Sequence, residues 1–461
     1  MFIRFTIDHY VGDKRYEAGQ SADLDKTICD RLIAQGVAAA NATDSNPAYL
    51  NIDPLTGGAT GLQEPSGKQL LASNFTKNFV GTRVLTGGAQ GGSYATSGQD
   101  FTWSLQVALP VDFVALRLVI GNPLTSAITG VTCAASTGGT LTDRTNNAGA
   151  WTSGTFSGAS SITLPAGVTG NPSVTLSDWI PVQSVARLDG GSTRLAYVRI
   201  LTPLANANIG LFGYAASTAN WNSKADGYAW CPRFQAGDFV TTPSGMTAST
   251  DPSSLPIMGI QYISKTGVLN YVAFGDSITN SAQTTVRGES WAYRAVRDAG
   301  YTLGAFGWDG QTTAQILTRA QVTIPLLKPT HAFYPIFSPN DGTPTAATQT
   351  AQFSRALQFV ELCRVNNCVP ILWTGLPKTT DGTNTTSAWT AGQDDLRKAL
   401  NSAFTSIGVE VVDMSGVLSD NAAMGTASKW LNTSILFDGT HPNDAGHELM
   451  KGAAAVSVAK F

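Results

Sequence analysis

The chain has 461 residues, of which 43% are hydrophobic and 13% charged, and it carries 47 glycines and a formal net charge of −3. This length suits two or three domains, and the low charge fraction with abundant glycine is typical of folded, strand-rich chains rather than disordered ones. The small negative charge gives no indication of a nucleic-acid partner or of attraction to an anionic membrane surface.

The first segment, residues 1–65, is predicted to be a small module followed by a linker. Residues 2–7 alternate like a strand, residues 23–36 have the apolar spacing of a helix, and the turn-rich stretch 42–61 is interpreted as the linker. The N-terminus lacks the apolar core of a secretory signal, and no apolar run is long enough to span a bilayer. We therefore expect no membrane partner, and either no export by the secretory route or a signal already removed.

Part of this first segment resembles modules of other proteins. Tyr16, Gly19 and the helical run that ends at Gly36 resemble short modules of bacteriophage structural proteins. The resemblance implies association with a virion, and homo-oligomer association is a further possibility that the sequence leaves open. The compartment is left open too, between a virion and the cell exterior reached by a non-classical route.

Residues 66–265 are predicted to form an all-β sandwich, of jelly-roll-like type. Short runs with strand character alternate with connections rich in Gly, Ser, Thr and Pro, a pattern typical of antiparallel sandwiches. The runs are residues 101–109, 113–121, 173–182, 194–202 and 209–216.

Residues 266–461 alternate between strands and helices, which predicts a parallel sheet with helices on both faces. The predicted strands are residues 268–274, 303–307, 330–337, 369–375 and 409–414, and the predicted helices are 289–300, 312–321, 345–365, 394–404 and a last one from 443. In such folds the functional site lies beyond the carboxyl ends of the strands.

The first candidate motif is Gly275-Asp276-Ser277, directly after an apolar strand. Glycine permits a tight turn there, which would hold the serine hydroxyl at the edge of the sheet. Taken alone, the motif favours an ordinary turn, because Asp and Ser are common turn residues.

The second candidate motif joins Asp438 to His441, just before the last helix. A carboxylate three residues before a histidine can orient the imidazole and stabilise its charged form. The alternative is a helix-capping loop with a surface histidine. His447 lies within the predicted helix and is interpreted as structural.

Two further residues follow predicted strands at the same edge. The side-chain amide of Asn340 can donate a hydrogen bond into the cleft, and the N–H of Gly310, at the start of a helix, can do the same. Each motif in isolation is only a turn signal.

The four motifs together, in the order Ser, Gly, Asn and Asp/His, resemble the blocks of the SGNH (GDSL-like) hydrolase family. The resemblance implies a three-layer, flavodoxin-like α/β catalytic domain over residues 266–461. It implies that Ser277 is the nucleophile, His441 the general base and then acid, and Asp438 the residue that orients it. It also implies an oxyanion hole made of the Ser277 and Gly310 N–H groups and the Asn340 side chain.

The sequence departs from the family pattern at two places. Ser338 stands where the third block usually has glycine, and Ala305 stands where the second block usually has asparagine. The second departure leaves Gly307 as an alternative to Gly310. Segments 117–123 and 177–191 resemble β-sandwich domains that precede some catalytic domains of this family.

The implied reaction is hydrolysis of an ester through an acyl-enzyme, and no cofactor or metal is expected. The leading hypothesis is a short-acyl, mainly acetyl, esterase acting on a small or glycan-linked ester. Trp151 and Trp221 are candidate sugar-stacking residues, and the alternative, which is commoner for tryptophan, is packing in a core or at its rim. An aliphatic ester or polyester hydrolase is the first alternative. The second is a virion structural or glycan-binding protein with an inactive hydrolase fold. A chain starting near residue 266 is expected to fold and to cleave small aryl esters.

Overall fold

The computed structural model divides the chain into two compact units, Met1–Lys68 and Gln69–Phe461. It describes residues 2–5, 9–11, 14–16, 21–23, 38–40, 78–85, 92–95, 98–140, 149–168, 171–206, 208–213, 230–242, 246, 254–285, 290–405 and 408–461.

The first unit contains short antiparallel strands. Strand β1 (Phe2–Phe5) pairs with β4 (Ser21–Asp23) and β5 (Ala38–Ala40), and β2 (His9–Val11) pairs with β3 (Lys14–Tyr16). The predicted strand at the N-terminus is confirmed. The predicted helix over 23–36 lies outside the described residues, except for the last residue of β4.

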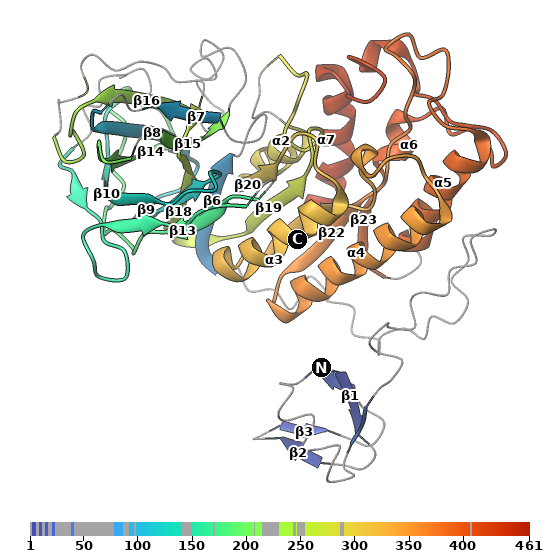
Figure 1. Ribbon diagram of the computed structural model, residues 1–461, viewed down its shortest axis with the longest axis horizontal. Coiled ribbons are helices and arrows are strands. Elements are labelled where there is room, and N and C mark those ends of the chain that lie inside the picture. Colours follow the sequence, from blue (N-terminus) through green and yellow to red (C-terminus); the bar gives the residue numbers. More distant parts are fainter. Residues whose placement is uncertain are drawn as a thin grey trace. The chain divides into compact units, whose positions relative to one another are not determined.

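The second unit is organised around a mixed nine-stranded sheet (Figure 1). Its strands lie in the order β13, β9, β18, β6, β20, β19, β21, β22 and β23. Their bounds are Ser173–Leu176, Phe113–Asn122, Ile257–Val268, Asn78–Leu85, Thr302–Gly307, Asn270–Gly275, His331–Pro335, Val369–Trp373 and Glu410–Val412. From β6 to β23 neighbouring strands are parallel, whereas β18, β9 and β13 continue the sheet with antiparallel pairing.

Helices cover both faces of the parallel part, so the predicted three-layer α/β fold is confirmed (Figure 1). Helices α2 and α7 pack together on one face, and α3 packs beside α4 on the other. The helices are α2 (Trp291–Asp298), α3 (Thr313–Leu327), α4 (Ala346–Val365), α5 (Ala391–Thr405), α6 (Met414–Leu418) and α7 (Asp444–Val458).

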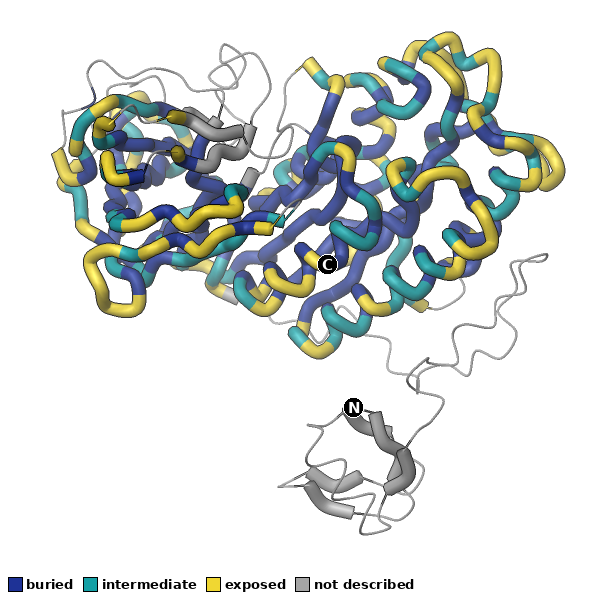
Figure 2. Tube along the Cα trace, viewed as in Figure 1, coloured by how far each residue is buried: buried dark blue, intermediate teal, exposed yellow. Residues whose placement is uncertain are grey.

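Local sequence accounts for where these helices begin. Ser290, Thr312, Thr345 and Asn443 are the N-caps of α2, α3, α4 and α7, and each side chain accepts hydrogen bonds from N–H groups of the first turn. Strands β19 to β22 are buried along their whole length (Figure 2). That explains why they appear in the sequence as nearly continuous apolar runs.

The remaining strands are antiparallel and precede the α/β part, as predicted. One sheet comprises β11, β10, β14, β8 and β16, with β12 beside β10, and another comprises β17, β15 and β7. Their bounds are Thr152–Ser153, Ile128–Thr137, Arg194–Thr202, Phe101–Leu109, Trp230–Ala236, Ile162–Leu164, Ser254–Leu255, Asn208–Gly213 and Gly92–Ala95. All nine residues of β8 are buried, so this strand is covered on both faces. The jelly-roll-like character of this region remains a prediction.

Hydrogen bonding runs across the predicted domain boundary at residue 265. Strand β18 spans that position, and β6, from the predicted sandwich, pairs with β20 of the predicted hydrolase domain. The two regions therefore share one sheet, so the hydrolase region lacks part of its sheet when it is separated from the preceding residues. Elsewhere, Cys363 and Cys368 are buried, free thiols that form no disulfide.

Candidate active site

The predicted motifs lie in connections at the carboxyl ends of parallel strands. Ser277 follows β19, Gly310 follows β20, and Asn340 follows β21. Asp438 and His441 lie in the loop that leads into α7. Because these strands are neighbours in the sheet, their carboxyl ends meet at one edge.

Three of the predicted residues are joined by hydrogen bonds. Ser277 Oγ lies 2.9 Å from His441 Nε2, and His441 Nδ1 lies 2.8 Å from Asp438 Oδ2. The backbone N–H groups of Thr440 and His441 both donate to Asp438 Oδ1, at 2.7 Å each. The carboxylate therefore holds both its own loop and the imidazole ring.

These contacts also affect the acidity of Asp438. Burial by itself would raise the pKa of this carboxyl, but the hydrogen bonds from His441 and Thr440 outweigh it and hold the pKa below its ordinary value. Asp438 is therefore ionised wherever the imidazole can act as a base, and its negative charge faces Nδ1.

The turn that carries Ser277 has specific side-chain requirements. A Cβ at Gly275 would overlap the side chain of Thr279, and the Gly275 carbonyl accepts the N–H of Trp308 at 3.1 Å. Asp276 is fully buried and its Oδ1 accepts the N–H of Ile278 at 3.0 Å. Burial raises the pKa of Asp276, while the hydrogen bonds from Ser338 and Ile278 oppose that rise.

The candidate oxyanion donors sit in the two neighbouring connections. Asn340 is exposed in the short 3-10 helix η4 (Pro339–Asp341), and its Nδ2 donates to the carbonyl of Gln311 at 3.1 Å. Gly310 is also exposed and has a φ of 75°, with open space where a Cβ would be. Gly307, the alternative, is buried within β20, where a Cβ would press on Asn280.

The residues that join these connections are not among the site residues predicted from the sequence. The hydroxyl of Ser338 lies 2.6 Å from Asp276 Oδ2 and 2.9 Å from the Gln311 carbonyl. Asp341 Oδ1 accepts the N–H of Thr313 at 3.1 Å, which ties the loop to the start of α3. In the sequence, Ser338 was visible only as a departure from the family's glycine, because hydrogen bonds between segments leave no periodic signal.

His447 has the structural role expected from the sequence. It is fully buried in α7, and its Nδ1 accepts the N–H of Trp291, at the start of α2, at 3.3 Å. Burial lowers the pKa of His447 to about 3, so the ring is neutral. Because Nδ1 accepts the Trp291 N–H, it carries no proton.

Replacing His447 by alanine is expected to lower the free energy of unfolding by roughly 2–3 kcal/mol, through a cavity and a lost acceptor. Unfolded His447 takes up a proton below its reference pKa of about 6.5, whereas the folded ring takes it up only near 3. The free energy of unfolding of the wild type should therefore decrease as the pH is lowered from about 6.5 to about 3. That of the alanine variant should decrease less over the same range. Thermal unfolding at several pH values measures this, and an essential role of His447 in turnover would contradict the assignment.

Two sequence hypotheses concern other parts of the molecule. Trp151 is half-buried, with the Arg199 guanidinium 3.9 Å from its ring centroid and Tyr197 packed against its edge. Its side chain therefore packs within the sandwich, whereas Trp221 lies outside the described residues.

In the described ranges, no group of three or more His, Cys, Asp or Glu is placed to hold a metal, and no helix is long and apolar enough to cross a membrane.

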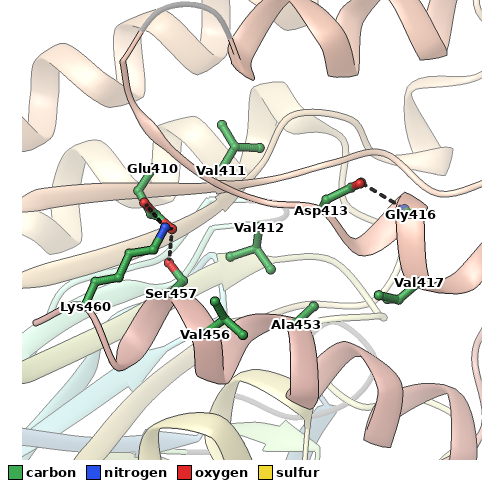
Figure 3. A pocket seen from close by; sticks show the side chains of 10 residues that line it. All are labelled: Glu410, Val411, Val412, Asp413, Gly416, Val417, Ala453, Val456, Ser457 and Lys460. Carbon is green, nitrogen blue, oxygen red and sulfur yellow. Dashed lines mark hydrogen bonds and ion pairs between the residues drawn. The ribbon is translucent and has the colours of Figure 1, made fainter.

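A separate hollow of about 420 Å³ lies at the far edge of the sheet (Figure 3). Strand β23, α6 and the end of α7 form its walls, and Ser457 there donates to Glu410 at 2.8 Å. None of the predicted catalytic residues lines it. Its lining residues are Glu410, Val411, Val412, Asp413, Gly416, Val417, Ala453, Val456, Ser457 and Lys460.

A three-layer α/β fold that brings a serine, a histidine and an aspartate together at the carboxyl edge of its sheet is an arrangement found in serine acyl hydrolases. Residues 273–449 match the model of the GDSL-like lipase/acylhydrolase family. This segment is a GDSL-like acylhydrolase domain, and the protein is an ester hydrolase.

Part of the chain is similar to several solved structures. One is a lipase/acylhydrolase from Enterococcus faecalis, at 20% identity and a TM-score of 0.32, covering 41% of this chain and 95% of that one. A GDSL-like lipase from Bacteroides thetaiotaomicron is 18% identical, with a TM-score of 0.31, covering 41% and 87%. A variant of an acetyl-xylooligosaccharide esterase from Geobacillus is 15% identical, with a TM-score of 0.31, covering 41% and 93%. No curated protein matches the chain.

Proposed function

We propose that this protein is a serine esterase that removes short acyl groups, chiefly acetyl, from carbohydrate. The observation that carries the mechanism is the chain of contacts from Ser277 Oγ to His441 Nε2 at 2.9 Å and from His441 Nδ1 to Asp438 Oδ2 at 2.8 Å. A serine is a weak nucleophile unless a base removes its proton, and a base positioned by a third group supplies that function.

In this mechanism Ser277 Oγ attacks the ester carbonyl while its proton passes to His441 Nε2. The carbonyl π electrons move to the oxygen, and the tetrahedral oxyanion is held by the N–H groups of Ser277 and Gly310 and by the Asn340 amide. When the oxyanion collapses, the bond to the alcohol breaks and His441 returns the proton to that oxygen. Water, activated by the same imidazole, then releases the acid and restores Ser277.

The loop after β22 supports a carbohydrate substrate over a long acyl chain. The N–H of Thr379 donates to the Gly439 carbonyl at 2.9 Å, so this loop lies against the loop that carries Asp438 and His441. It presents exposed hydroxyl and carboxylate groups, on Thr380, Asp381, Thr383, Thr385 and Thr386. Polar groups of this kind hydrogen-bond to sugar hydroxyls.

An exposed aromatic residue lies in the same region. Phe437, directly before Asp438, is 58% exposed, and its backbone N–H donates to the His441 carbonyl at 2.9 Å. A flat apolar ring beside polar groups is a surface on which a pyranose ring can stack, while the hydroxyls at its rim stay hydrogen-bonded.

The test is acetate release from a panel of acetylated oligosaccharides, compared with p-nitrophenyl acetate, longer p-nitrophenyl esters and a soluble polyester. The proposal predicts the highest kcat/KM on an acetylated oligosaccharide, and a fall in activity as the acyl chain lengthens. Preference for long acyl chains or for the polyester would favour the aliphatic or polyester alternative. Absence of turnover on every substrate would favour an inactive fold.

Substituting Asp438 by asparagine is expected to lower kcat by roughly 10⁴-fold, because the imidazole loses the charge that orients and stabilises it. The depressed pKa of Asp438 means that its charge persists down to a pH below its reference value of about 3.9. Its contribution to stability is therefore present above that pH and is lost as the pH falls through the depressed value. Steady-state kinetics and unfolding measured from acid to neutral pH test both statements.

Wild-type activity should rise from acid to neutral pH, since only a neutral imidazole can accept the serine proton. A kcat/KM that is independent of pH between roughly 5 and 9 would rule out histidine base catalysis.

A further inference from the structure

One buried hydroxyl, that of Ser338, lies within hydrogen-bond distance of groups in the three connections that carry Ser277, Gly310 and Asn340. Ser338 is completely buried in the connection after β21, directly before η4. Its Oγ lies 2.6 Å from Asp276 Oδ2, 2.9 Å from the Gln311 carbonyl and 3.3 Å from the Asn340 backbone N–H. Each of these partners is next to, or part of, a proposed catalytic group.

The first partner fixes the nucleophile turn. Asp276 precedes Ser277 in the chain and is fully buried, so its position sets where the backbone of Ser277 lies. Its Oδ1 accepts the Ile278 N–H, and among the described residues Ser338 is the hydrogen-bond partner that the structure gives to Oδ2. Loss of the Ser338 hydroxyl would leave a buried polar oxygen unpaired, which is costly enough to move the turn.

The other two partners fix the proposed oxyanion donors. Gln311 follows Gly310, and its carbonyl accepts the Asn340 Nδ2 at 3.1 Å and lies within hydrogen-bond distance of the Ser338 Oγ, at 2.9 Å. As the N-cap of η4, Ser338 also determines how Asn340 leaves the strand.

The hydroxyl has one hydrogen and two acceptors within reach, so two arrangements satisfy the network. When Asp276 is ionised, Ser338 donates to Oδ2. When Asp276 is protonated, its O–H donates to Ser338, and Ser338 donates to the Gln311 carbonyl. His441, Asp341 and Arg319 are the ionisable groups near enough to influence this balance. In both arrangements Ser338 Oγ stays bonded to Asp276.

We propose that Ser338 is a positioning residue, whose hydroxyl holds the loop of the Ser277 nucleophile in register with the loops of the Gly310 and Asn340 donors. This inference rests on the proposed serine-esterase function. Glycine, the usual residue of the family's third block, cannot make these contacts, so this chain sets the geometry of its site with a hydroxyl.

The loop has a second anchor that does not touch the site. Asp341 accepts the Thr313 N–H at 3.1 Å and the Gln352 Nε2 at 3.0 Å, which ties η4 to α3 and α4. This anchor should keep the loop folded when the Ser338 hydroxyl is removed, so the loss is expected in the alignment of the donors rather than in the fold.

The decisive experiment compares Ser338→Ala with Ser457→Ala in the full chain. Ser457 is a matched control, because it is also buried and donates to a carboxylate, that of Glu410, at 2.8 Å, but it lies in the hollow at the far edge of the sheet (Figure 3). Both variants lose one hydroxyl–carboxylate hydrogen bond. With p-nitrophenyl acetate, Ser338→Ala should lower kcat by up to about 10²-fold with little change in KM, because misplaced donors weaken transition-state binding. Ser457→Ala should leave kcat unchanged.

The proposal is overturned if Ser338→Ala is folded and its kcat equals that of Ser457→Ala. If Ser338→Ala does not fold, Asp276→Asn and Asp276→Ala decide the matter. An asparagine amide can donate to Ser338 Oγ while its oxygen accepts the Ile278 N–H, so Asp276→Asn should keep a much higher kcat than Asp276→Ala. Equal values in the two variants would overturn the proposal.

Wild type and Ser277→Ala, assayed alongside, separate this inference from the proposed function. If wild type does not turn over, or if Ser277→Ala is as active as wild type, the proposed function fails and this inference fails with it. If Ser277→Ala is inactive and Ser338→Ala keeps the wild-type kcat, only the inference fails.

Discussion

Substituting Ser277 by alanine is expected to lower kcat on p-nitrophenyl acetate by about 10⁶-fold, as for removal of a nucleophile from a catalytic group that acts as a unit. The alanine variant has no Oγ to form the acyl-enzyme. His441 Nε2, which lies 2.9 Å from Oγ in the wild type, then has no serine proton to accept. Water attack aided by the oxyanion donors would be the remaining route.

The fold should survive this substitution. Ser277 is 6% exposed, and its hydroxyl contributes one side-chain hydrogen bond, to His441, which is worth about 0.5–1.5 kcal/mol net. Circular dichroism and thermal unfolding should therefore match wild type closely. A serine-directed phosphonate should label wild type at Ser277 and leave the variant unlabelled. Labelling at another serine, or a fully active variant, would refute the assignment.

A chain that starts at residue 266 is expected to be insoluble or unfolded, in contrast to what the sequence pattern predicted. Such a chain lacks β6, which lies between β18 and β20 in the sheet. Its removal exposes the edge of β20 along Gly304 and Ala305, which pair with Val84 and Leu85. An uncovered edge strand with apolar side chains is a site of aggregation.

The control is a chain that starts at residue 69, which keeps the whole second compact unit. This chain should unfold in one cooperative transition and should keep the kcat and KM of the full protein on small esters, because every residue of the proposed site lies within it. Solubility, a thermal unfolding curve and turnover of p-nitrophenyl acetate, measured for both truncations, test the prediction. A soluble and active chain from residue 266 would show that β6 is dispensable.

Much of the α/β architecture could be predicted because its signals are local. The apolar runs at 268–274 and 330–337 became β19 and β21, and the expected helices at 345–365 and from 443 became α4 and α7. A parallel strand that is buried on both faces needs apolar residues along its length, and N-cap residues mark where a helix begins. Both effects act over a few neighbouring residues, so they can be read without knowing the rest of the fold.

The partition of the sheet could not be predicted in the same way. Strand β6 lies more than two hundred residues before β20 in the sequence, and nothing in its apolar alternation says which strand it joins. Register and neighbours depend on backbone hydrogen bonds between distant segments. The composition of the chain changes near residue 265, but β18 crosses that position and pairs with β6 on both sides of it.

The candidate triad could be proposed from the sequence, because Ser277, Asp438 and His441 belong to short motifs with fixed internal spacing. How those motifs are joined is visible only in the folded chain. Ser277 and His441 are 164 positions apart in the chain and are joined by one 2.9 Å contact. The hydroxyl of Ser338 links the turn before Ser277 to the loops of Gly310 and Asn340. Such contacts depend on where separate strands end in space, and a spacing along the chain carries no information about that. For this reason Ser338 appeared in the sequence as a departure from a motif, and in the fold as a member of the site.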